Sequence, residues 1–218
     1  MNRSILITGF DPFGGETINP AFEAVRMLPD ELAGFKLCKL EIPTEFLAGS
    51  RALLAALASE RPAAVVCVGQ AGGRTAITPE RVAINLMDAR IADNAGFQPV
   101  DLPVVPGGPA AYFSTLPIKK IAERIQRAGL PAAVSNTAGT YVCNSLFYTL
   151  LHTAAREYPA LRGGFIHVPY AEQQLSGKPA GTFGMALSDI AAGLRCAVET
   201  IAEVLTEEMD LESKNDNY

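Results

Sequence analysis

The sequence predicts an α/β domain whose largely parallel sheet is covered by helices on both faces. Short apolar runs alternate along the chain with segments of helical periodicity, which is typical of βαβ units. One of these runs is apolar throughout rather than at every second position, as in strands buried on both faces. Hydrophobic residues make up 49% and charged residues 19% of the 218 residues, so the chain can bury a sizeable core. No linker or repeat divides it, and we expect one domain over residues 1–218.

The first elements have clear boundaries. Residues 4–10 (SILITGF) predict a buried strand that leads into a loop rich in glycine, proline and asparagine. A helix follows as far as Leu28, with Asn19 as its N-cap and Pro20 at the first helical position. A second strand is expected over residues 35–43 (FKLCKLEIP).

The middle of the chain is less regular. Residues 44–60 are rich in alanine and leucine and predict a helix that Thr44 caps. Residues 63–70 (AAVVCVGQ) predict a third strand. From about residue 69 to residue 116 glycines and prolines interrupt the pattern, and only residues 82–86 (VAINL) predict a strand. Long loops in a compact domain usually carry function, so we expect part of a site here.

The last part of the chain predicts five further elements and a tail. They are an amphipathic helix over residues 117–128, a buried strand over 132–137 (AAVSNT), a helix over 143–157, a last strand over 163–169 (GGFIHVP), and a final helix whose apolar stripe runs from Leu187 to Leu205. From about residue 209 to residue 218 the chain is polar, and we expect this tail to fray.

Composition excludes several classes of partner. The net charge of -5 and the absence of a basic stripe argue against nucleic-acid binding. No apolar run is long enough for a membrane span or a signal peptide. The four cysteines lack metal-ligand spacing and there are only two histidines, so we expect no metal and no other cofactor. Widely spaced free thiols fit a reducing cytoplasm.

Among the four cysteines, Cys143 differs in position. Cys67 lies inside an apolar strand, while Cys38 and Cys196 lie within a strand and a helix, where packing roles are expected. Cys143 follows a predicted strand and a turn and stands at the start of a helix. Unpaired N–H groups and the helix dipole favour a thiolate there, so Cys143 is the candidate nucleophile.

A cysteine nucleophile needs a base, and the two histidines differ in reach. His152 lies nine residues along the same predicted helix, about 13 Å up its axis. His167 ends the predicted strand of residues 163–169, which we expect beside the end of the strand of residues 132–137. His167 is therefore the candidate general base and acid.

A third residue should orient the imidazole. Four carboxylates lie in loop-rich regions near predicted strand ends, and spacing alone does not choose among them. They are Asp11, Glu80, Asp88 and Asp93.

Four segments together resemble the pyroglutamyl peptidase type I family, also called pyrrolidone-carboxylate peptidases. They are LITGFDPFGGETINPA, GQAGGRTAITPERVAINLMDARIADNAGFQP, SNTAGTYVCNSLFY and FIHVPY, which occur in this order. The resemblance implies a three-layer α/β/α sandwich with a mixed, mostly parallel central sheet. It also implies a cysteine exopeptidase that cleaves the amide bond after an N-terminal pyroglutamyl residue of peptides.

The resemblance assigns roles to individual residues. The family's catalytic cysteine and histidine fall on Cys143 and His167, and its catalytic glutamate falls on Glu80 in PERVAIN. This assignment, not spacing, decides among the four carboxylates. The arginine of DARIADN, here Arg90, lies at the family's site and is expected to support the oxyanion with the backbone N–H of Cys143.

The pocket expected for pyroglutamate needs apolar walls and a few hydrogen bonds to the ring amide. The family places its pocket on Phe10 and Phe13, with main-chain groups near Gln70 as candidates for the ring amide. The remaining wall positions implied by the family are Ile91, Tyr141 and Val142.

Two alternatives to the peptidase stay open at this point. A phosphorylase or transferase of the same fold would use the glycine-rich loops to hold phosphate, although no GK[ST] follows them. An inactive protein that binds pyroglutamyl peptides is the other. Family members are often homo-oligomers, so the resemblance implies a homodimer or homotetramer, with residues 93–113 as a candidate contact.

Overall fold

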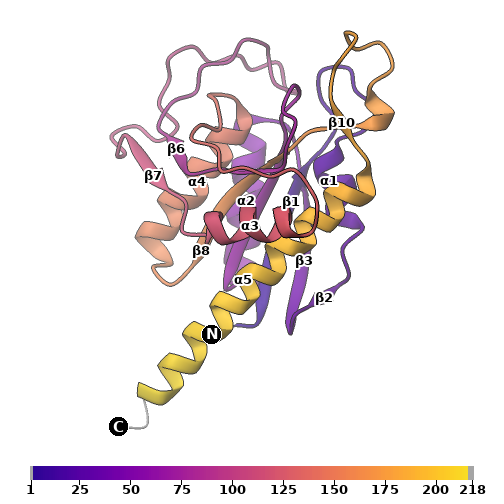
Figure 1. Cartoon of the computed structure of the whole chain (residues 1–218). Helices are drawn as coiled ribbons and strands as arrows, with labels where there is room; N and C mark the ends of the chain where they lie inside the picture. The colour runs from indigo at the N-terminus through magenta and orange to yellow at the C-terminus, as the bar shows by residue number, and fades with distance from the viewer. Residues whose placement is uncertain (1, 216–218) are drawn as a thin grey trace.

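A six-stranded mixed sheet forms the centre of the molecule (Figure 1). The computed structural model describes residues 2–215, apart from the side chains of residues 212, 213 and 215. The strand order is β2-β3-β1-β4-β8-β5. Four strands are parallel, namely β1 (Ser4–Phe10), β3 (Phe35–Ile42), β4 (Ala64–Gln70) and β8 (Arg162–Val168). The two edge strands, β2 (Glu31–Leu32) and β5 (Thr78–Pro79), pair antiparallel.

Helices cover both faces of this sheet. On one face pack α1 (Pro20–Arg26), α3 (Ile118–Arg127) and α5 (Leu187–Asn215), and on the other α2 (Phe46–Glu60) and α4 (Val142–Glu157). Strand β1 supplies Ile5 to the first core and Leu6 to the second. Successive strand residues face opposite sides, so an apolar strand contributes to two cores at once. The predicted three-layer fold is confirmed.

Two short strand pairings and one turn of 3-10 helix complete the described fold. Strand β6 (Val82–Ile84) pairs antiparallel with β7 (Ala111–Phe113). Strands β9 (Tyr170–Ala171) and β10 (Gly184–Met185) flank the 3-10 helix η1 (Glu172–Gln174). Of these four short strands, only β6 was predicted, as part of residues 82–86. Strands of two or three residues are too short to show a clear periodicity in the sequence.

The N-termini of α1 and α2 are capped differently, one by an adjacent residue and the other by a residue distant in the sequence. Asn19 caps α1 as predicted, since its side chain accepts the N–H of Ala21. Thr44 does not cap α2, and that prediction is wrong. The helix begins at Phe46, whose N–H donates to the carboxylate of Asp93 at 2.9 Å. The cap comes from a residue 47 positions away in the sequence, which no local pattern reveals.

The predicted strand over residues 132–137 is not a regular strand. The segment lies parallel to residues 77–81, but only isolated bridges form, at Ala132 and Ser135. Backbone N–H groups at residues 77, 81, 133 and 135 donate across this pair. A regular parallel pair would also need a hydrogen bond from the N–H of residue 79. This residue is a proline and has no N–H, so the row of hydrogen bonds between the two segments is interrupted there.

Helix α5 is longer than predicted. It continues to Asn215, so the tail expected to fray from about residue 209 is helical over its described part. Residues 216–218 lie outside the described residues. The segment contains good helix formers. Just before it, Glu208 forms an ion pair with Arg162, the first residue of β8. Figure 1 shows this end of α5 projecting beyond the sheet.

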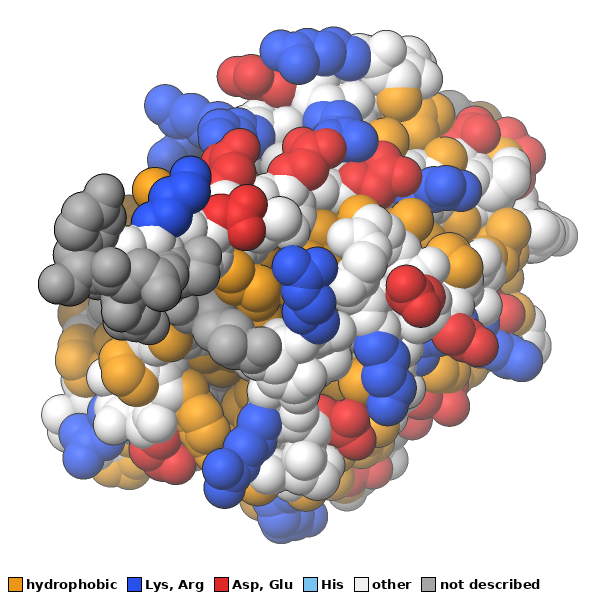
Figure 2. All heavy atoms as spheres, turned by 90° about the horizontal axis from the view of Figure 1, so that it is seen from below, with side chains coloured by type: hydrophobic (Ala, Val, Ile, Leu, Met, Phe, Trp, Pro, Cys, Tyr) orange, Lys and Arg blue, Asp and Glu red, His pale blue; other side chains and the backbone are white. Residues whose placement is uncertain are grey.

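The surface carries no dominant charge where it is displayed. On the face in Figure 2, acidic and basic side chains are interspersed around apolar ones. Within residues 2–215, no helix has the length and apolar character needed to cross a membrane.

Candidate active site

A cavity opens at the carboxyl end of the parallel strands. Its volume is about 340 Å³. Strands β1, β4 and β8 all end beside it, which is where ligands bind in open α/β sheets. The lining residues are Phe10, Phe13, Asn19, Thr44, Gln70, Ala71, Gly72, Arg74, Arg90, Thr137, Ala138, Gly139, Tyr141, Cys143 and His167.

Cys143 is the second residue of α4, as its predicted place at a helix start requires. The N-cap residue Tyr141 makes no side-chain capping bond, so the first N–H groups of the helix are left for another acceptor. Asn144, fully buried, fixes this helix start to β6. Its amide exchanges hydrogen bonds with the backbone of Ile84 at 3.0 and 2.9 Å.

Gly69 makes room for the thiol. In the parallel β4–β8 ladder it lies directly opposite His167. A Cβ atom at Gly69 would lie 2.9 Å from Sγ of Cys143 and 2.7 Å from the ring of Phe165. Paired strands are only about 4.8 Å apart, so the sulfur occupies space beside His167 that a side chain at residue 69 would otherwise fill.

His167 bonds to Glu80 because of the antiparallel edge strand. Thr78 pairs with His167, and Glu80 donates its N–H to the carbonyl of Phe165 at 2.9 Å. Phe165 and His167 are two residues apart on β8, so they share a face with Glu80. The result is a 2.7 Å contact between Nδ1 of His167 and Oε1 of Glu80. Residues 132–137 were expected beside β8, but β5 lies between them.

Arg74 is a site residue that the sequence analysis missed. Its Nη1 donates to Oε1 of Glu80 at 2.6 Å and also to the hydroxyl of Thr78. Its Nη2 donates to the carbonyl of Thr137 at 2.9 Å. The available signal was a basic side chain next to a glycine turn directly after a buried strand. Gly73 adopts a φ of 88° in this turn.

Burial decides the protonation of both reactive groups. The pKa of the Cys143 thiol is raised to about 12, first by burial and second by the charge of Glu80, while the charge of Arg74 lowers it. Burial also lowers the pKa of His167, against the hydrogen bond to Glu80, which raises it. The helix start was expected to favour a thiolate; desolvation acts in the opposite direction and is the largest influence on the pKa of the thiol. Burial thus favours the neutral form of both groups.

The other thiols and the second histidine lie away from this arrangement. Cys67 is fully buried, and burial raises its pKa to about 12. Cys38 and Cys196 are partly buried and do not line the cavity. His152 faces the β6–β7 hairpin instead, with its Nδ1 3.0 Å from the hydroxyl of Tyr112.

The other three candidate carboxylates, as the structure describes them, do not contact the imidazole of His167. Asp11 accepts the N–H of Thr44 at 2.7 Å. Asp93 caps α2 and accepts two N–H groups of its own loop. Asp88 has an exposed side chain. Within the described residues, Glu80 is the carboxylate in contact with an imidazole.

Aromatic rings form one wall of the cavity. Phe10 is 2% exposed and belongs to the core as well as to the lining. The rings of Phe13 and Tyr141 have centroids 6.3 Å apart. The Tyr141 hydroxyl donates to the carbonyl of Ala92 at 3.0 Å, so this residue offers the cavity a ring.

The amide of Gln70 has a defined orientation. The backbone N–H of Ala171 donates to Oε1 of Gln174, which makes the other end of that amide a donor. The Gln174 Nε2 then donates to Oε1 of Gln70 at 2.9 Å and to the carbonyl of Ile18 at 3.3 Å. The hydrogen bond from Gln174 therefore occupies the oxygen of the Gln70 amide and not its NH₂ group. The sequence pattern gave no signal for Gln174, because 104 residues separate it from Gln70.

Three further expected residues differ in position. Arg90 lines the cavity and is exposed, and it makes no ion pair with Asp88 or Asp93 in the described part of the chain. Ile91 is 51% exposed and Val142 is 1% exposed, and neither is among the lining residues. Their assignment as wall residues stays a prediction.

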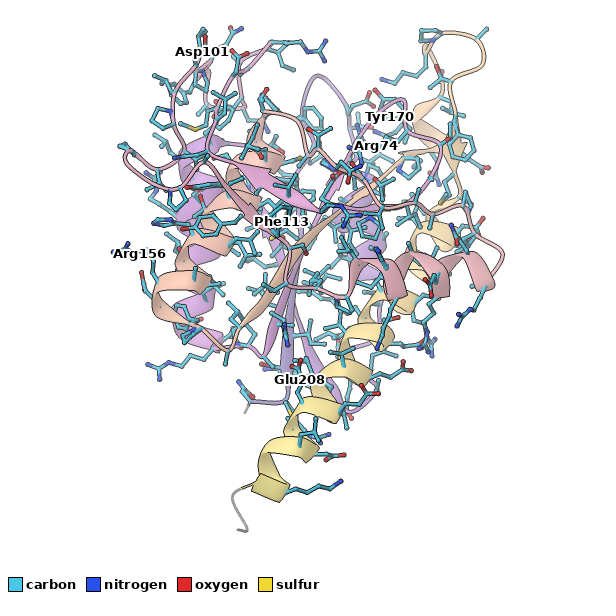
Figure 3. All side chains as sticks on the ribbon, turned by 60° about the vertical axis from the view of Figure 1, so that its left-hand side comes forward. Arg74, Asp101, Phe113, Arg156, Tyr170 and Glu208 are labelled. Carbon is cyan, nitrogen blue, oxygen red and sulfur yellow. The ribbon has the colours of Figure 1, made fainter. Side chains whose placement is uncertain are left out.

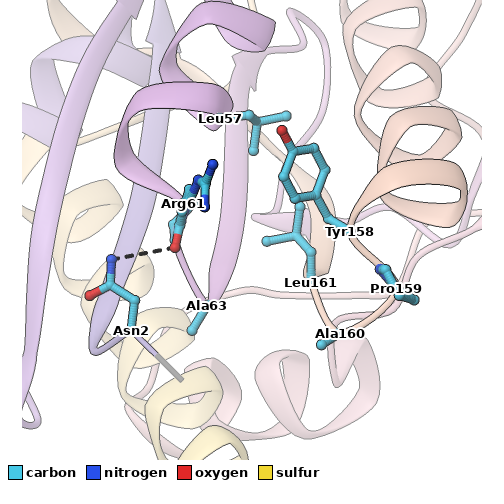
Figure 4. Close-up of a pocket in the computed structure, with 9 residues that line it drawn as sticks. Asn2, Leu57, Arg61, Ala63, Tyr158, Pro159, Ala160 and Leu161 are labelled. Carbon is cyan, nitrogen blue, oxygen red and sulfur yellow. Dashed lines mark hydrogen bonds between the residues drawn. The ribbon is translucent and has the colours of Figure 1, made fainter.

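A second cavity lies at the opposite end of the sheet (Figure 4). Its volume is about 220 Å³, and Leu57, Tyr158 and Leu161 are among its lining residues. Asn2 closes one side through a bond to the carbonyl of Arg61. It holds no cysteine, histidine or carboxylate, so it offers no nucleophile or base.

The first cavity instead combines a thiol at a helix start with an imidazole bonded to a buried carboxylate. On an α/β/α sandwich, this arrangement is typical of a cysteine hydrolase.

Comparison with known proteins identifies the family. The family model described as pyroglutamyl peptidase matches residues 3–204. The pyrrolidone-carboxylate peptidase of Levilactobacillus brevis is 54% identical over 90% of this chain and 96% of its own length. Pyrrolidone-carboxylate peptidase 1 of Streptococcus pneumoniae serotype 4 is 51% identical over 95% and 96%. The chain belongs to the pyroglutamyl peptidase family, and the resemblance seen in the sequence is confirmed.

Solved structures agree with this identification. The crystal structure of pyroglutamyl peptidase I from Bacillus amyloliquefaciens matches with a TM-score of 0.89 and 49% identity, covering 93% of this chain and 98% of that one. The pyrrolidone carboxyl peptidase from Thermococcus litoralis matches with a TM-score of 0.90 and 34% identity, covering 94% and 96%. The fold is thus shared over 93–94% of this chain.

Proposed function

We propose that this protein is a cysteine exopeptidase that hydrolyses the amide bond after an N-terminal pyroglutamyl residue, with Cys143, His167 and Glu80 as its catalytic triad. The single observation that carries the triad is the 2.7 Å contact between His167 and a fully buried Glu80, beside the thiol that fills the space over Gly69. Membership of the family supports the substrate class.

The first half-reaction follows from the protonation of the site. The Nδ1–H of His167 donates a hydrogen bond to Glu80, which leaves Nε2 as the basic nitrogen. As the Cys143 sulfur attacks the pyroglutamyl carbonyl, its proton passes to Nε2. Collapse of the tetrahedral intermediate breaks the C–N bond, and His167 returns the proton to the leaving amine. A thioester to Cys143 remains.

The second half-reaction uses the same groups. His167 takes a proton from water, the hydroxide oxygen attacks the thioester carbonyl, and the thiolate leaves and recovers the proton. In both steps negative charge develops on the carbonyl oxygen. The uncapped N–H groups at the start of α4, including that of Cys143, support this oxyanion, and Arg90 on the cavity wall adds a positive charge.

Recognition of the lactam uses apolar walls and a few polar contacts. The rings of Phe10, Phe13 and Tyr141 enclose the neutral ring. The free NH₂ of Gln70 is oriented to donate to the ring carbonyl, an acceptor that a prolyl residue lacks. No acidic anchor is required, because pyroglutamate has no free amine.

The deciding experiment measures release of a fluorophore from a pyroglutamyl amide by wild type and Cys143→Ser. The wild type should turn over the pyroglutamyl amide in phosphate-free buffer, the prolyl amide should be a poor substrate, and Cys143→Ser should lose nearly all activity. Absence of wild-type turnover would sink the peptidase. Activity that needs phosphate and survives Cys143→Ser would support a phosphorylase instead.

Three further properties belong to the same proposal. The chain acts as a single catalytic domain, in the cytoplasm, and as a homodimer or homotetramer. Four free cysteines support a reducing compartment. Exposed apolar side chains of the expected contact segment support an oligomer, among them Phe97, Val100, Leu102 and Phe113. Sedimentation at micromolar concentration tests the oligomer, and a monomer would contradict it.

A further inference from the structure

Among the residues that the structure describes, Arg74 is the cation bonded to the buried carboxylate of Glu80. Glu80 is 0% exposed, and both of its side-chain contacts use Oε1, from His167 at 2.7 Å and from Arg74 at 2.6 Å. Its Oε2 has no hydrogen-bond partner among the described residues. A buried carboxylate without a compensating cation is costly, so these two contacts stabilise Glu80 in its buried place.

The guanidinium is held in place from two sides. Its Nη2 donates to the carbonyl of Thr137, in the loop that leads to Cys143. The turn that carries it packs beneath Tyr170, since a Cβ at Gly72 would lie 2.2 Å from that ring. Figure 3 shows Arg74 and Tyr170 together at one end of the sheet. A planar guanidinium held in this way keeps its Nη1–H directed at Oε1 of Glu80.

We propose that Arg74 is a positioning residue of the reaction, which holds the Glu80 carboxylate in place against His167 and acts on catalysis chiefly through Glu80. This role rests on the proposed function. Arg74 touches no reacting atom in it. The carboxylate held in this way accepts a hydrogen bond from the Nδ1–H of His167. The imidazole therefore keeps the tautomer in which Nε2 is free to take the proton of the thiol.

The electrostatics of the site agree with this placement. The pKa of Cys143 is raised first by burial and second by Glu80, while the charge of Arg74 lowers it. Arg74 and Glu80 thus act on the thiol with opposite sign, and their pairing leaves a smaller net charge beside it. A Lys would keep the charge but could not bond Glu80 and Thr137 at once.

A double-mutant cycle tests the dependence on Glu80. We measure kcat and KM on a pyroglutamyl amide for wild type, Glu80→Gln, Arg74→Gln and the double variant. Arg74→Gln should lower kcat about 10- to 100-fold, as for other partners behind an active-site histidine. KM should change less than about threefold, because no substrate contact is lost. The double variant should be no less active than Glu80→Gln alone.

The thermal midpoints give a second readout. Arg74→Gln leaves a buried carboxylate without its cation and should have the lowest midpoint. The double variant removes that charge and should recover part of the loss. If Arg74→Gln fails to fold, the comparison of the double variant with Glu80→Gln still decides, because neither contains an unpaired Glu80.

Arg81→Gln is the matched control. Its Nε donates to Oδ1 of Asn136 at 2.8 Å, so it bonds the same loop without touching Glu80, and its kcat should stay near wild type. A loss as large as that of Arg74→Gln would overturn the specific role. Multiplied losses in the double variant, or a rise in KM with kcat unchanged, would also overturn it. An inactive wild type would overturn the proposed function itself, and this role with it.

Discussion

The two histidines of the chain make similar hydrogen bonds in different surroundings. In each, Nδ1 lies about one hydrogen-bond length from an oxygen, at 2.7 Å for His167 and 3.0 Å for His152. The partner of His167 is a buried carboxylate, and a thiol lies beside it. The partner of His152 is the hydroxyl of Tyr112, and its ring stacks on Tyr148 with an interplanar angle of 15°.

The difference teaches that a bonded imidazole is not by itself a base. A carboxylate partner stabilises the imidazolium that forms when a proton is taken, whereas a neutral hydroxyl does so far less. His167 also reaches a cavity, while His152 is enclosed by two tyrosine rings. The predictions below test this contrast, beginning with the largest effect.

Removing each imidazole gives the largest contrast. His167→Ala should lower kcat about 10²–10⁴-fold, because the general base and acid is lost. His152→Ala should leave kcat near that of wild type, since its ring bonds only Tyr112. Steady-state kinetics on a pyroglutamyl amide measures both. Equal losses in the two variants would contradict the contrast.

Filling the space opposite His167 should have the next largest effect. Gly69→Ala places a methyl group 2.9 Å from the Cys143 sulfur, and displacing the sulfur by about 1 Å costs roughly 10²-fold in kcat. Gly163→Ala is the control on β8, because its methyl would meet the side chains of Leu150 at 3.2 Å and Leu151 at 3.5 Å, away from the sulfur. Wild-type kcat in Gly69→Ala would mean that the sulfur is not confined there.

Reversing the amide network should weaken substrate binding. Gln174→Glu keeps the acceptor for Ala171 but removes the donor to Gln70. Gln70 then turns its oxygen toward the cavity, so KM for the pyroglutamyl amide should rise about tenfold, as expected for one lost hydrogen bond. An unchanged KM would show that the Gln70 amide does not contact the lactam.

The acid limb of kcat/KM reports the surroundings of His167. Because burial lowers its pKa from 6.5, the basic form persists below that pH, and activity is lost only as pH falls through the lowered value. Glu80 raises this pKa, so Glu80→Gln should shift the limb further down in pH. A wild-type midpoint at or above 6.5 would argue that burial does not dominate.

The smallest effect should come from the second histidine's partner. Tyr112→Phe removes the hydroxyl bonded to His152 and should destabilise the protein by about 1 kcal/mol or less. Urea denaturation measures the change, and kcat should stay at the wild-type value. A fall in kcat of tenfold or more would link this cluster to the site.

Much of the fold could be read from local patterns. The apolar runs placed β1, β3, β4 and β8, and Asn19 with Pro20 placed the start of α1. Periodicity and caps involve residues within a few positions of each other, so a sequence displays them directly. The same reasoning singled out Cys143 at a helix start and His167 at a strand end. Residues 132–137 were misread because the missing donor of Pro79 lies in another segment.

By itself, then, the sequence determined the layers, the candidate thiol and the candidate imidazole, and through resemblance the family. Only the tertiary structure decided how Glu80 meets His167 across 87 residues, through an antiparallel edge strand whose direction no local pattern encodes. It also decided that Arg74 joins them, and that burial rather than the helix start governs the thiol. The physical reason is that register and desolvation depend on which distant segments pack together.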